Sequence, residues 1–283
     1  CLSGTDLSSS DLRSQGFISS GMSEEKASLT AIVLGASGSV GHEVCRSIAR
    51  NVNFGHLVVI NRGKKLEALE ALPGEVKVTQ IVLKKEEFGN PRKLREATAN
   101  ACKSHGVTRA LTALGIGTKT GSITKEQHRA VDVELNKAFA QGCADAKQVS
   151  SLVLLSSVGA NPNANENGSG TAGGPRYLRV KGESEEAIKT ITEIPTRVII
   201  RPAMIIGSQH TPSVLICMEP CCLYLCCLWL CIPSKFRSVE IEDLGLAMAL
   251  ASVSDKEFGV GSHTLERDEF MALVKQMPTT AMQ

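Results

Sequence analysis

Ala31-Ile-Val-Leu-Gly-Ala-Ser-Gly-Ser-Val-Gly-His42 decides the fold, because it places three glycines at three-residue spacing between an apolar run and an amphipathic segment. The first glycine permits a tight turn, the second lets backbone amides approach a ligand, and the third allows close helix-to-strand packing. The N-terminus of the following helix favours negative charge. The pattern therefore predicts a pyrophosphate-binding turn; the alternative is a tight turn without a ligand. The residues expected at the ligand are Gly35, Ser37, Gly38, Ser39, Val40 and Gly41.

Outward from this turn, short β-branched runs alternate with longer amphipathic segments. This alternation is typical of repeated βαβ units, so the expected fold class is α/β, a doubly wound parallel sheet of the Rossmann type with a small C-terminal substrate-side region. Strands are expected at 30–34, 56–60, 76–83, 108–114, 151–156 and 196–201. Helices are expected from the glycine turn to residue 50 and at 66–72, 94–104, 125–147, 175–190 and 240–252, with a last strand-helix pair at 262–276.

The chain of 283 residues has an ordinary hydrophobic fraction of 42% and a charged fraction of 21%, which suit one globular domain. Residues 1–28 are rich in Ser, Gly and Asp without apolar periodicity, and we expect a flexible leader there. The dinucleotide-binding domain is expected at 29–276, with a cysteine-rich substrate-side insert at 206–236 and a tail at 277–283. A net charge of +2 gives no field that would favour nucleic acid, which we exclude.

The end of the second expected strand discriminates between cofactors. An acid there would bond the ribose of NAD, whereas a base would accommodate the additional phosphate of NADP. This chain has Asn61, Arg62, Lys64 and Lys65 and no acid. A guanidinium binds phosphate in a bidentate manner, so Arg62 and Lys64 favour NADP(H), with NAD the lesser expectation. The alternative interpretation is a solvated basic helix start.

A candidate catalytic set follows the fifth expected strand. Ser156 and Ser157 end that strand, and Tyr177 and Lys181 lie four residues apart on the next expected helix. This spacing puts both side chains on one face, where an ammonium favours the ionised phenol. The phenol can then exchange a proton with a carbonyl or alcohol oxygen that Ser157, or as second choice Ser156, holds by a hydrogen bond. The alternative is a surface tyrosine beside a solvated lysine.

With these motifs the chain resembles the atypical short-chain dehydrogenase/reductases, closest to the branch of the Tat-interacting-protein oxidoreductases and their fungal relatives. The resemblance runs from about Leu29 to the C-terminus. It rests on the glycine turn, Leu114-Gly-Ile-Gly-Thr-Lys119, Val131-Asp132, Leu154-Leu-Ser-Ser-Val-Gly-Ala160, Tyr177-Leu-Arg-Val-Lys-Gly-Glu183 and Ile200-Arg-Pro202. It implies that Ser157, Tyr177 and Lys181 form the catalytic triad. It also implies that residues 114–118, including Leu114, Gly115 and Thr118, line the dinucleotide with Ser156, Tyr177, Lys181, Arg201 and Pro202.

The chain departs from the family pattern in two places. Lys84 and Lys85 follow the third expected strand, where the family often has an acid that meets the adenine. Between Ile206 and Pro233 the chain carries its cysteine cluster, where relatives place substrate-binding elements. The family's substrate therefore does not transfer to this chain.

The segment from Cys221 to Ile232 holds twelve residues without charge. A membrane-spanning helix needs about 20 apolar residues, so this segment is expected to be a buried or amphipathic helix over the substrate cleft. The alternative is peripheral membrane contact or S-palmitoylation, because Trp229 lies among leucines and thiols. We expect no metal, since the segment lacks histidine and paired C-x-x-C elements. The scattered cysteines elsewhere and the absence of a recognisable secretory signal favour the cytosol.

Together these features predict an NADP(H)-dependent oxidoreductase that acts on the carbonyl or alcohol of a small apolar molecule. The alternative is a dinucleotide-binding regulatory or scaffold protein with little turnover. No role is assigned to His42, His128 or His210, because none has a metal-like set of partners. Neither the substrate, the direction of the reaction nor the oligomeric state follows from the sequence.

Overall fold

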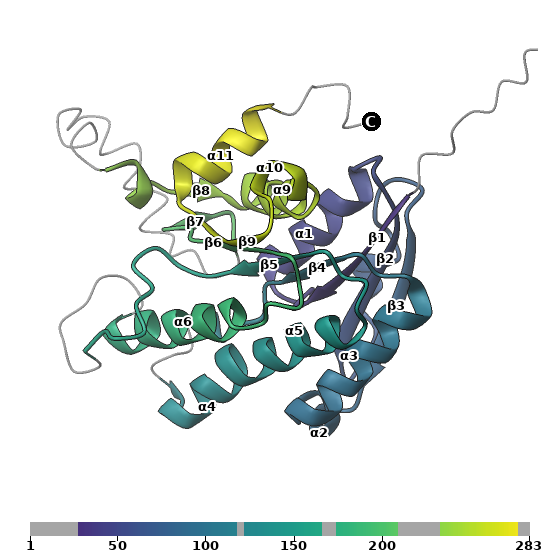
Figure 1. The fold of residues 1–283 in the computed structure, drawn as a ribbon, viewed down its shortest axis with the longest axis horizontal. Coiled ribbons are helices and arrows are strands. Elements are labelled where there is room, and N and C mark those ends of the chain that lie inside the picture. The colour runs from purple at the N-terminus through teal and green to yellow at the C-terminus, as the bar shows by residue number, and fades with distance from the viewer. Residues whose placement is uncertain (1–27, 118–121, 166–173, 209–232, 277–283) are drawn as a thin grey trace, which may run out of the picture.

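A parallel sheet forms the centre of the molecule in the computed structural model, which describes residues 28–117, 122–165, 174–208 and 233–276. Its seven strands are ordered β3-β2-β1-β4-β5-β6-β9 (Figure 1). The order reverses direction at β1, which places the ends of β1 and β4 side by side at the switch point of the sheet. The strands are β1 (Leu29–Leu34), β2 (Phe54–Arg62), β3 (Lys77–Leu83), β4 (Arg109–Thr112), β5 (Ser151–Leu155), β6 (Thr196–Ile200) and β9 (Gly261–Leu265).

Successive side chains of β1 enter two different apolar cores, as the period of two in a strand requires. Ile32 and Leu34 belong to one core, and Ala31 and Val33 belong to the other. All four are fully buried. Such strands are covered by helices on both faces, which explains why they are apolar throughout rather than alternating.

One face of the sheet is covered by α3, α5 and α6, which lie below the sheet in Figure 1. Leu94, Phe139 and Ile188 of these helices are buried in the first core. The short α2 and α4 and the π-helical segment η3 adjoin this layer. The elements are α2 (Lys85–Phe88), α3 (Pro91–His105), α4 (Lys125–Arg129), η3 (Ala130–Leu135), α5 (Asn136–Asp145) and α6 (Gly174–Lys189).

The other face is covered by α1, α9 and α11, which lie above the sheet in Figure 1. Ile48, Met248 and Phe270 of these helices are buried in the second core. A two-stranded parallel sheet, β7 with β8, extends this side. The elements are α1 (Ser39–Arg50), β7 (Ile205–Ile206), η4 (Ser234–Phe236), β8 (Val239–Glu240), α9 (Ile241–Val253), α10 (Asp255–Phe258) and α11 (Arg267–Gln276).

The structure confirms the doubly wound parallel sheet and corrects some of the expected elements. The helix expected at 66–72 is a single 3-10 turn, η1 (Glu67–Leu69), because the Gln80 side chain binds both the amide and the carbonyl of Leu66. The helix expected at 125–147 ends at Asp145 and contains the π-helical segment η3. The short strands β7 and β8 were not expected. The chain between 113 and 117, expected in part as strand, is a loop whose contacts are described below.

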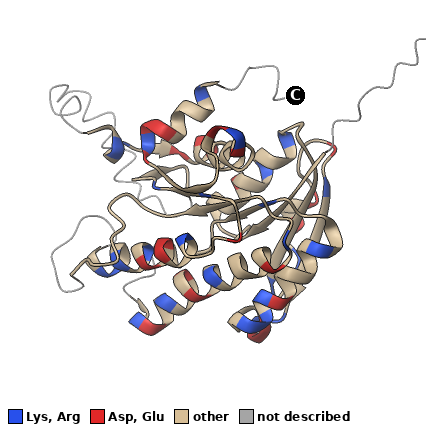
Figure 2. Ribbon diagram, in the orientation of Figure 1, with Lys and Arg blue, Asp and Glu red and all other residues tan. Residues whose placement is uncertain are grey.

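Several predicted features lie outside the described residues: most of the leader, Thr118, the apolar stretch 221–232 and the tail. Within the described ranges, no helix has the length and apolar character needed to cross a bilayer. Charged residues lie mainly on the outward faces of the helices (Figure 2). Lys181, Asp132 and Glu185 are exceptions, since all three are buried.

Candidate functional site

The glycine turn between β1 and α1 has the close backbone packing that its sequence predicts. Gly35 has φ +91°, and a Cβ there would lie 2.7 Å from the amide nitrogen of Leu114. A Cβ at Gly41 would lie 2.1 Å from the carbonyl oxygen of Gly35. Both positions therefore require glycine, the first for its conformation and both for space.

Gly38 differs from its two neighbours, because a Cβ there would meet its nearest atom only at 3.5 Å. Gly38 is the N-cap of α1, no side chain caps this helix end, and its first turn contains no acid. Ser37 and Gly38 are exposed, and Ser39 and Val40 are half-buried. A helix N-terminus without a side-chain cap and without an acid in its first turn suits an anionic ligand. The residues present therefore fit the phosphate groups of a dinucleotide.

Basic side chains collect where β2 and β3 end. Arg62 and Lys64 are exposed, and the amide of Gly63 donates to the Leu83 carbonyl at 2.7 Å. The Lys85 side chain lies against Gly63, 3.6 Å from where its Cβ would be. Asn61 is buried and donates to Gln80, so it faces the interior and not this edge. The edge beside the glycine turn is therefore basic, as expected for a phosphate-binding position.

The loop after β4, residues 113–117, lies between the glycine turn and α6. Leu114 packs against Gly35, and a Cβ at Gly115 would lie 3.0 Å from the Lys181 Nζ. The Asn136 side chain donates to the Leu114 carbonyl at 3.2 Å, and the Ile116 amide donates to Asp132 at 2.9 Å. Leu114 thus lies against the glycine turn, and Gly115 lies against Lys181.

Tyr177 and Lys181 lie together on α6. The Lys181 Nζ is 5.7 Å from the centroid of the Tyr177 ring, and Tyr177 is half-buried while Lys181 is buried. The i,i+4 spacing therefore brings the two side chains onto one face, as predicted. The ammonium also forms an ion pair with the Asp132 carboxylate at 2.8 Å, which the spacing alone did not predict.

Ser157 lies in the loop after β5, and this loop packs directly on α6. The Asn161 amide donates to the Leu178 carbonyl at 3.0 Å, and a Cβ at Gly182 would lie 2.3 Å from the backbone nitrogen of Pro162. The Ser157 hydroxyl is half-exposed and donates to the Val158 carbonyl at a long 3.4 Å. This weak bond leaves the hydroxyl able to turn toward a ligand.

Ser156 and Arg201, both expected at the cofactor, bind Glu185 of α6. The Ser156 hydroxyl donates to the Glu185 carboxylate, and the Arg201 guanidinium donates to both of its oxygens, Nε at 2.8 Å. Glu185 is buried with an exposed fraction of 1%. Pro202 is buried, and its carbonyl accepts from the Val158 amide. In this structure Ser156 and Arg201 thus hold α6 against the ends of β5 and β6.

Three residues without a predicted role, His128, Asp132 and Asn136, belong to the site. They lie four residues apart along α4, η3 and α5, so they share one face of the helix. His128 and Asp132 are fully buried, and the His128 Nε2 lies 3.8 Å from the Asp132 Oδ2. The imidazole stacks on Tyr177 with ring centroids 6.1 Å apart. The i,i+4 spacing of three polar residues was the available sequence signal.

The charges in this cluster have defined protonation states. Burial lowers the pKa of Lys181, but the Asp132 carboxylate, Tyr177 and Glu185 together raise it well above its ordinary value. Burial also lowers the pKa of His128, and the raising effect of Asp132 is too small to compensate. At neutral pH the lysine is therefore an ammonium and the histidine a neutral imidazole.

Comparisons with solved structures agree with this fold. A short-chain dehydrogenase/reductase from Mycobacterium ulcerans superposes with a TM-score of 0.63 at 15% identity, covering 86% of this chain and 90% of that one. The chain shares the Rossmann-type fold of this protein. A short-chain dehydrogenase/reductase from Serratia marcescens superposes with a TM-score of 0.61 at 14% identity, and the match covers 86% of this chain and 98% of that one. The L-sorbose reductase of Gluconobacter frateurii, complexed with NADPH and L-sorbose, superposes with a TM-score of 0.59 at 16% identity. That match covers 84% of this chain and 95% of the reductase.

At these identities the likeness to solved structures concerns the fold. No protein-family model matches the sequence, and no curated protein matches it. The fold by itself determines neither the reaction nor the cofactor nor the substrate.

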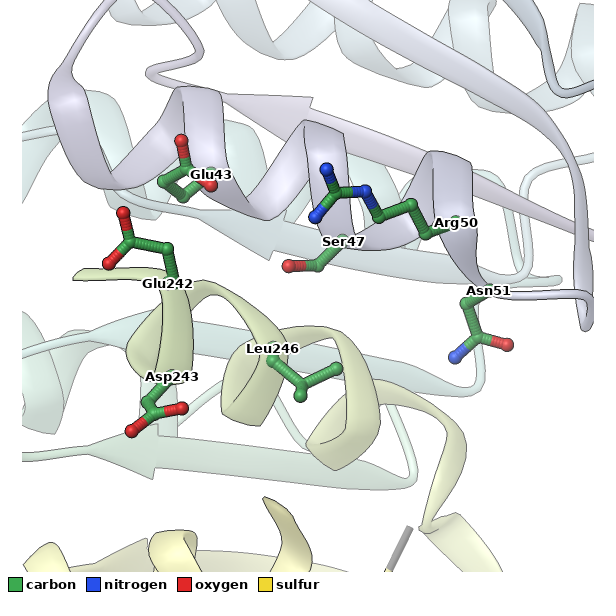
Figure 3. Close-up of a pocket in the computed structure, with 7 residues that line it drawn as sticks. All are labelled: Glu43, Ser47, Arg50, Asn51, Glu242, Asp243 and Leu246. Atoms are coloured by element: carbon green, nitrogen blue, oxygen red, sulfur yellow. The ribbon is translucent and has the colours of Figure 1, made fainter. Parts of the chain in front are cut away.

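A pocket of about 200 Å³ lies elsewhere, between α1 and α9 (Figure 3). Glu43 and Arg50 of α1 and Glu242 and Asp243 of α9 line it, and no predicted site residue does. Within the described residues no group of three or more histidines, cysteines and carboxylates is placed to hold a metal ion. In this fold the chemistry-bearing side chains lie instead around the loop 113–117.

Proposed function

We propose that the chain is an NADP(H)-dependent oxidoreductase that reduces a carbonyl, or oxidises an alcohol, on a small apolar molecule. The observation that carries this proposal is one chain of contacts at the carboxyl edge of the sheet. Gly35 packs against Leu114, and the next residue, Gly115, packs against the Lys181 ammonium. A dinucleotide bound at the glycine turn would therefore extend toward the Tyr177–Lys181 pair.

The residues of the site divide the work of such a reaction. When bound, the nicotinamide supplies or accepts the hydride. Tyr177 exchanges a proton with the substrate oxygen, and the ammonium of Lys181 lies beside its ring. Ser157 binds the same oxygen through its hydroxyl. Glu185 orients α6, which carries the tyrosine and the lysine.

The basic edge supports NADP(H) over NAD. Arg62 and Lys64 would bind the additional phosphate, and no acid stands where NAD would need one. The L-sorbose reductase of the same fold is complexed with NADPH, which agrees with this preference. Within this family we assign the chain to the Tat-interacting-protein branch, on its sequence motifs.

The test of the proposed reaction is NADPH consumption against a panel of aldehydes and ketones, with the wild type, Tyr177→Phe and Ser157→Ala compared. Removal of an acid–base group lowers the rate by about 10²–10⁴-fold, so Tyr177→Phe is expected to lose nearly all turnover. Its affinity for NADPH should change little. Tight NADPH binding by the wild type without turnover on any substrate would instead indicate a dinucleotide-binding regulatory protein.

The test of cofactor choice is titration with NADPH and NADH. Arg62→Gln is expected to weaken NADPH binding by roughly ten- to hundredfold, the worth of one hydrogen bond between charged groups, and to leave NADH unaffected. Arg92→Gln, at an exposed position of α3, is the matched control. Tighter binding of NADH than of NADPH by the wild type would contradict the role given to Arg62.

We also propose that the protein is cytosolic, which the cysteine distribution supports. We propose further that residues 221–232 cover the substrate cleft. Replacing the six cysteines between 217 and 231 by serine is expected to leave the protein in the cytosolic fraction, as in the wild type. A membrane-associated wild type that these substitutions release would favour lipidation of the segment.

A further inference from the structure

The pocket between α1 and α9 holds a second group of charged side chains, and no residue of the proposed reaction lines it (Figure 3). Its volume of about 200 Å³ is smaller than that of pockets for drug-sized ligands, which hold about 300–1,000 Å³. The residues that line it are Glu43, Ser47, Arg50, Asn51, Glu242, Asp243 and Leu246. The pocket therefore has room for a small polar molecule.

Close packing between the two helices fixes the walls of this pocket. A Cβ at Gly245 of α9 would lie 2.8 Å from the carbonyl carbon of Glu43 in α1, so the helices touch at this point. The Glu43 carboxylate also pairs with Arg46 at 3.2 Å. Behind the pocket, Ile48 of α1 and Leu244 of α9 are fully buried in one apolar core. The shape of the pocket therefore follows from the packing of the protein itself.

The Asn51 side chain indicates that the pocket takes a ligand, because it is buried with its amide nitrogen unpaired. Asn51 has an exposed fraction of 3%, and its oxygen accepts from the backbone amide and the side chain of Asn53, both at 3.0 Å. Its nitrogen has no partner among the residues that the structure describes, and in Figure 3 it lies on the pocket side of the side chain. A buried donor without an acceptor costs folding free energy, so native proteins usually supply one. A ligand oxygen in the pocket would satisfy it.

Charges of opposite sign lie toward the two ends of the pocket. The carboxylates of Glu242 and Asp243 lie at one end, and Asn51 lies at the other, with the Arg50 guanidinium turned back along α1 (Figure 3). Within the described ranges none of these three charged side chains forms an ion pair. Acids in the first turn of a helix also stabilise it, so they alone would not indicate a ligand. The unpaired donors at the other end do.

We propose that this pocket binds a small aminocarboxylate, with its ammonium at Glu242 and Asp243 and its carboxylate at Arg50 and Asn51. Hydrogen bonds between charged groups then form at both ends of the ligand. Glu43 and Arg50 are seven residues apart on α1, which corresponds to about 10 Å along the helix. The two charges of the ligand are therefore separated by a chain, as in an ω-amino acid, rather than adjacent as in glycine. This site is independent of the proposed reaction.

Isothermal titration calorimetry with 6-aminohexanoate tests the charge pattern of the pocket. The wild type is expected to bind it with a dissociation constant below about 10 mM. Hexylamine lacks the carboxylate and hexanoate lacks the ammonium, so each should bind at least about tenfold more weakly, the worth of one hydrogen bond to a charged group. Glycine should also bind more weakly, because its charges cannot reach both ends. Equal affinity for hexylamine, or no binding of 6-aminohexanoate, would overturn the proposal.

Two variants at exposed positions test the two ends separately without disturbing the core. Arg50→Gln should weaken the binding of 6-aminohexanoate about two- to fivefold at low salt and leave hexylamine unaffected, and Glu242→Gln should weaken it equally and leave hexanoate unaffected. The matched controls are Arg92→Gln on α3 and Glu257→Gln on α10, which are also exposed and should change neither affinity. If the pocket variants bound 6-aminohexanoate as tightly as the controls, the ligand would not lie in this pocket.

The side-chain amide of Asn51 provides a direct measurement in the unaltered protein. In ¹⁵N-labelled wild type, its NMR signals should shift when 6-aminohexanoate is added, because the nitrogen gains an acceptor. The signals of Asn61, which is buried and already donates to Gln80 at 2.7 Å, should not shift. Asn51 signals that stay in place at saturating 6-aminohexanoate would refute the assignment of the carboxylate end. Absence of NADPH turnover would refute the proposed reaction and leave this measurement valid.

Discussion

The candidate site has two halves, the glycine turn after β1 and the charged cluster around α6, and they consist of different chemical groups. At the glycine turn after β1 the ligand-facing surface is backbone, and its geometry depends on Gly35 and Gly41 having no side chain. Around α6 the site consists of charged pairs, Lys181 with the buried Asp132 and the half-buried Arg201 with the buried Glu185. Substitutions that add a side chain disrupt the glycine turn, whereas substitutions that remove a charge disrupt the charged half around α6.

The difference also separates binding from chemistry. A backbone cradle presents a fixed array of amides, which suits a phosphate that does not change during a reaction. Paired charges can hold a proton-transferring group in one state, which suits the reacting end of the ligand. The loop 113–117 contacts both halves, so a displacement of either half would shift the other through Leu114 and Gly115.

The largest effect is expected when a methyl group is added within the backbone half. Gly41→Ala would place a Cβ 2.1 Å from the Gly35 carbonyl, so α1 and the turn must separate. We expect a loss of more than about 4 kcal/mol of folding free energy, with undetectable NADPH binding. Gly38→Ala has space for its Cβ and should fold normally while binding NADPH at least about tenfold more weakly, since the methyl group occupies the ligand side.

Urea unfolding and NADPH titration of the two variants distinguish the roles of these glycines. Ser47→Ala, on the same helix, is the control that should change neither quantity. If Gly38→Ala bound NADPH like the wild type, the turn would be structural only.

The next effect concerns the charged half. Lys181→Met leaves the Asp132 carboxylate buried without its partner, which typically costs about 3–5 kcal/mol of folding free energy. Lys189→Met, on the same helix, breaks an exposed pair with Glu186 and should cost less than about 1 kcal/mol. Adding Asp132→Asn to Lys181→Met should recover part of the loss in urea unfolding. Equal stabilities of the two lysine variants would show that the buried pair contributes no more than the exposed one.

The glycine turn could be predicted from sequence because three glycines at this spacing indicate a tight turn with close backbone packing. The apolar runs beside Gly35, Gly38 and Gly41 predicted the parallel sheet that the structure confirms. The Tyr177–Lys181 pair was predictable for a similar reason, because i,i+4 neighbours meet on any helix. In each case the partners are local in the chain.

The charged half escaped prediction where its partners are distant in sequence. Asp132 and Lys181 are 49 positions apart, and nothing local in either segment shows that η3 and α6 pack together. The π-helical geometry at Ala130–Leu135 also alters the side-chain register in a way that a period of 3.6 does not anticipate. The family resemblance implied that Ser156 and Arg201 line the dinucleotide, and in the structure the side chains of both residues bind Glu185 of α6. Sequence periodicity does not reveal these bonds to Glu185.

A smaller effect is expected at Glu185. Glu185→Gln removes the charge that receives Arg201 and Ser156, which should cost about 2 kcal/mol, the usual worth of hydrogen bonds to a charged group. The neighbouring Glu186→Gln breaks only an exposed pair and should cost less than about 1 kcal/mol. Chemical denaturation of both variants provides the comparison. If Glu185→Gln were as stable as Glu186→Gln, the bonds to α6 would not stabilise the fold.

The smallest effect is a pH dependence that His128 gives to the folded protein. Burial lowers the pKa of His128 below its ordinary value of 6.5, so the unfolded chain binds more protons than the folded one once the pH falls under that value. Stability should therefore decrease with acidification, by at most about 1.4 kcal/mol per pH unit from this one group. In His128→Gln the decrease between pH 7.5 and 5.5 should be smaller.

His56 provides the comparison, because its pKa is also lowered by burial and by His105 and Lys77. Its side chain lies at the amino end of the sheet and hydrogen-bonds to Thr79, so His56→Gln tests an imidazole away from the charged half. The Asp145 carboxylate does not affect the result, since its pKa lies below its ordinary value of 3.8, outside this interval. If the free energy of unfolding had the same slope against pH in His128→Gln as in the wild type, the imidazole beside Asp132 would accept a proton in the folded state. The net charge beside Tyr177 would then change with pH, and the cluster could not hold Lys181 in a constant field.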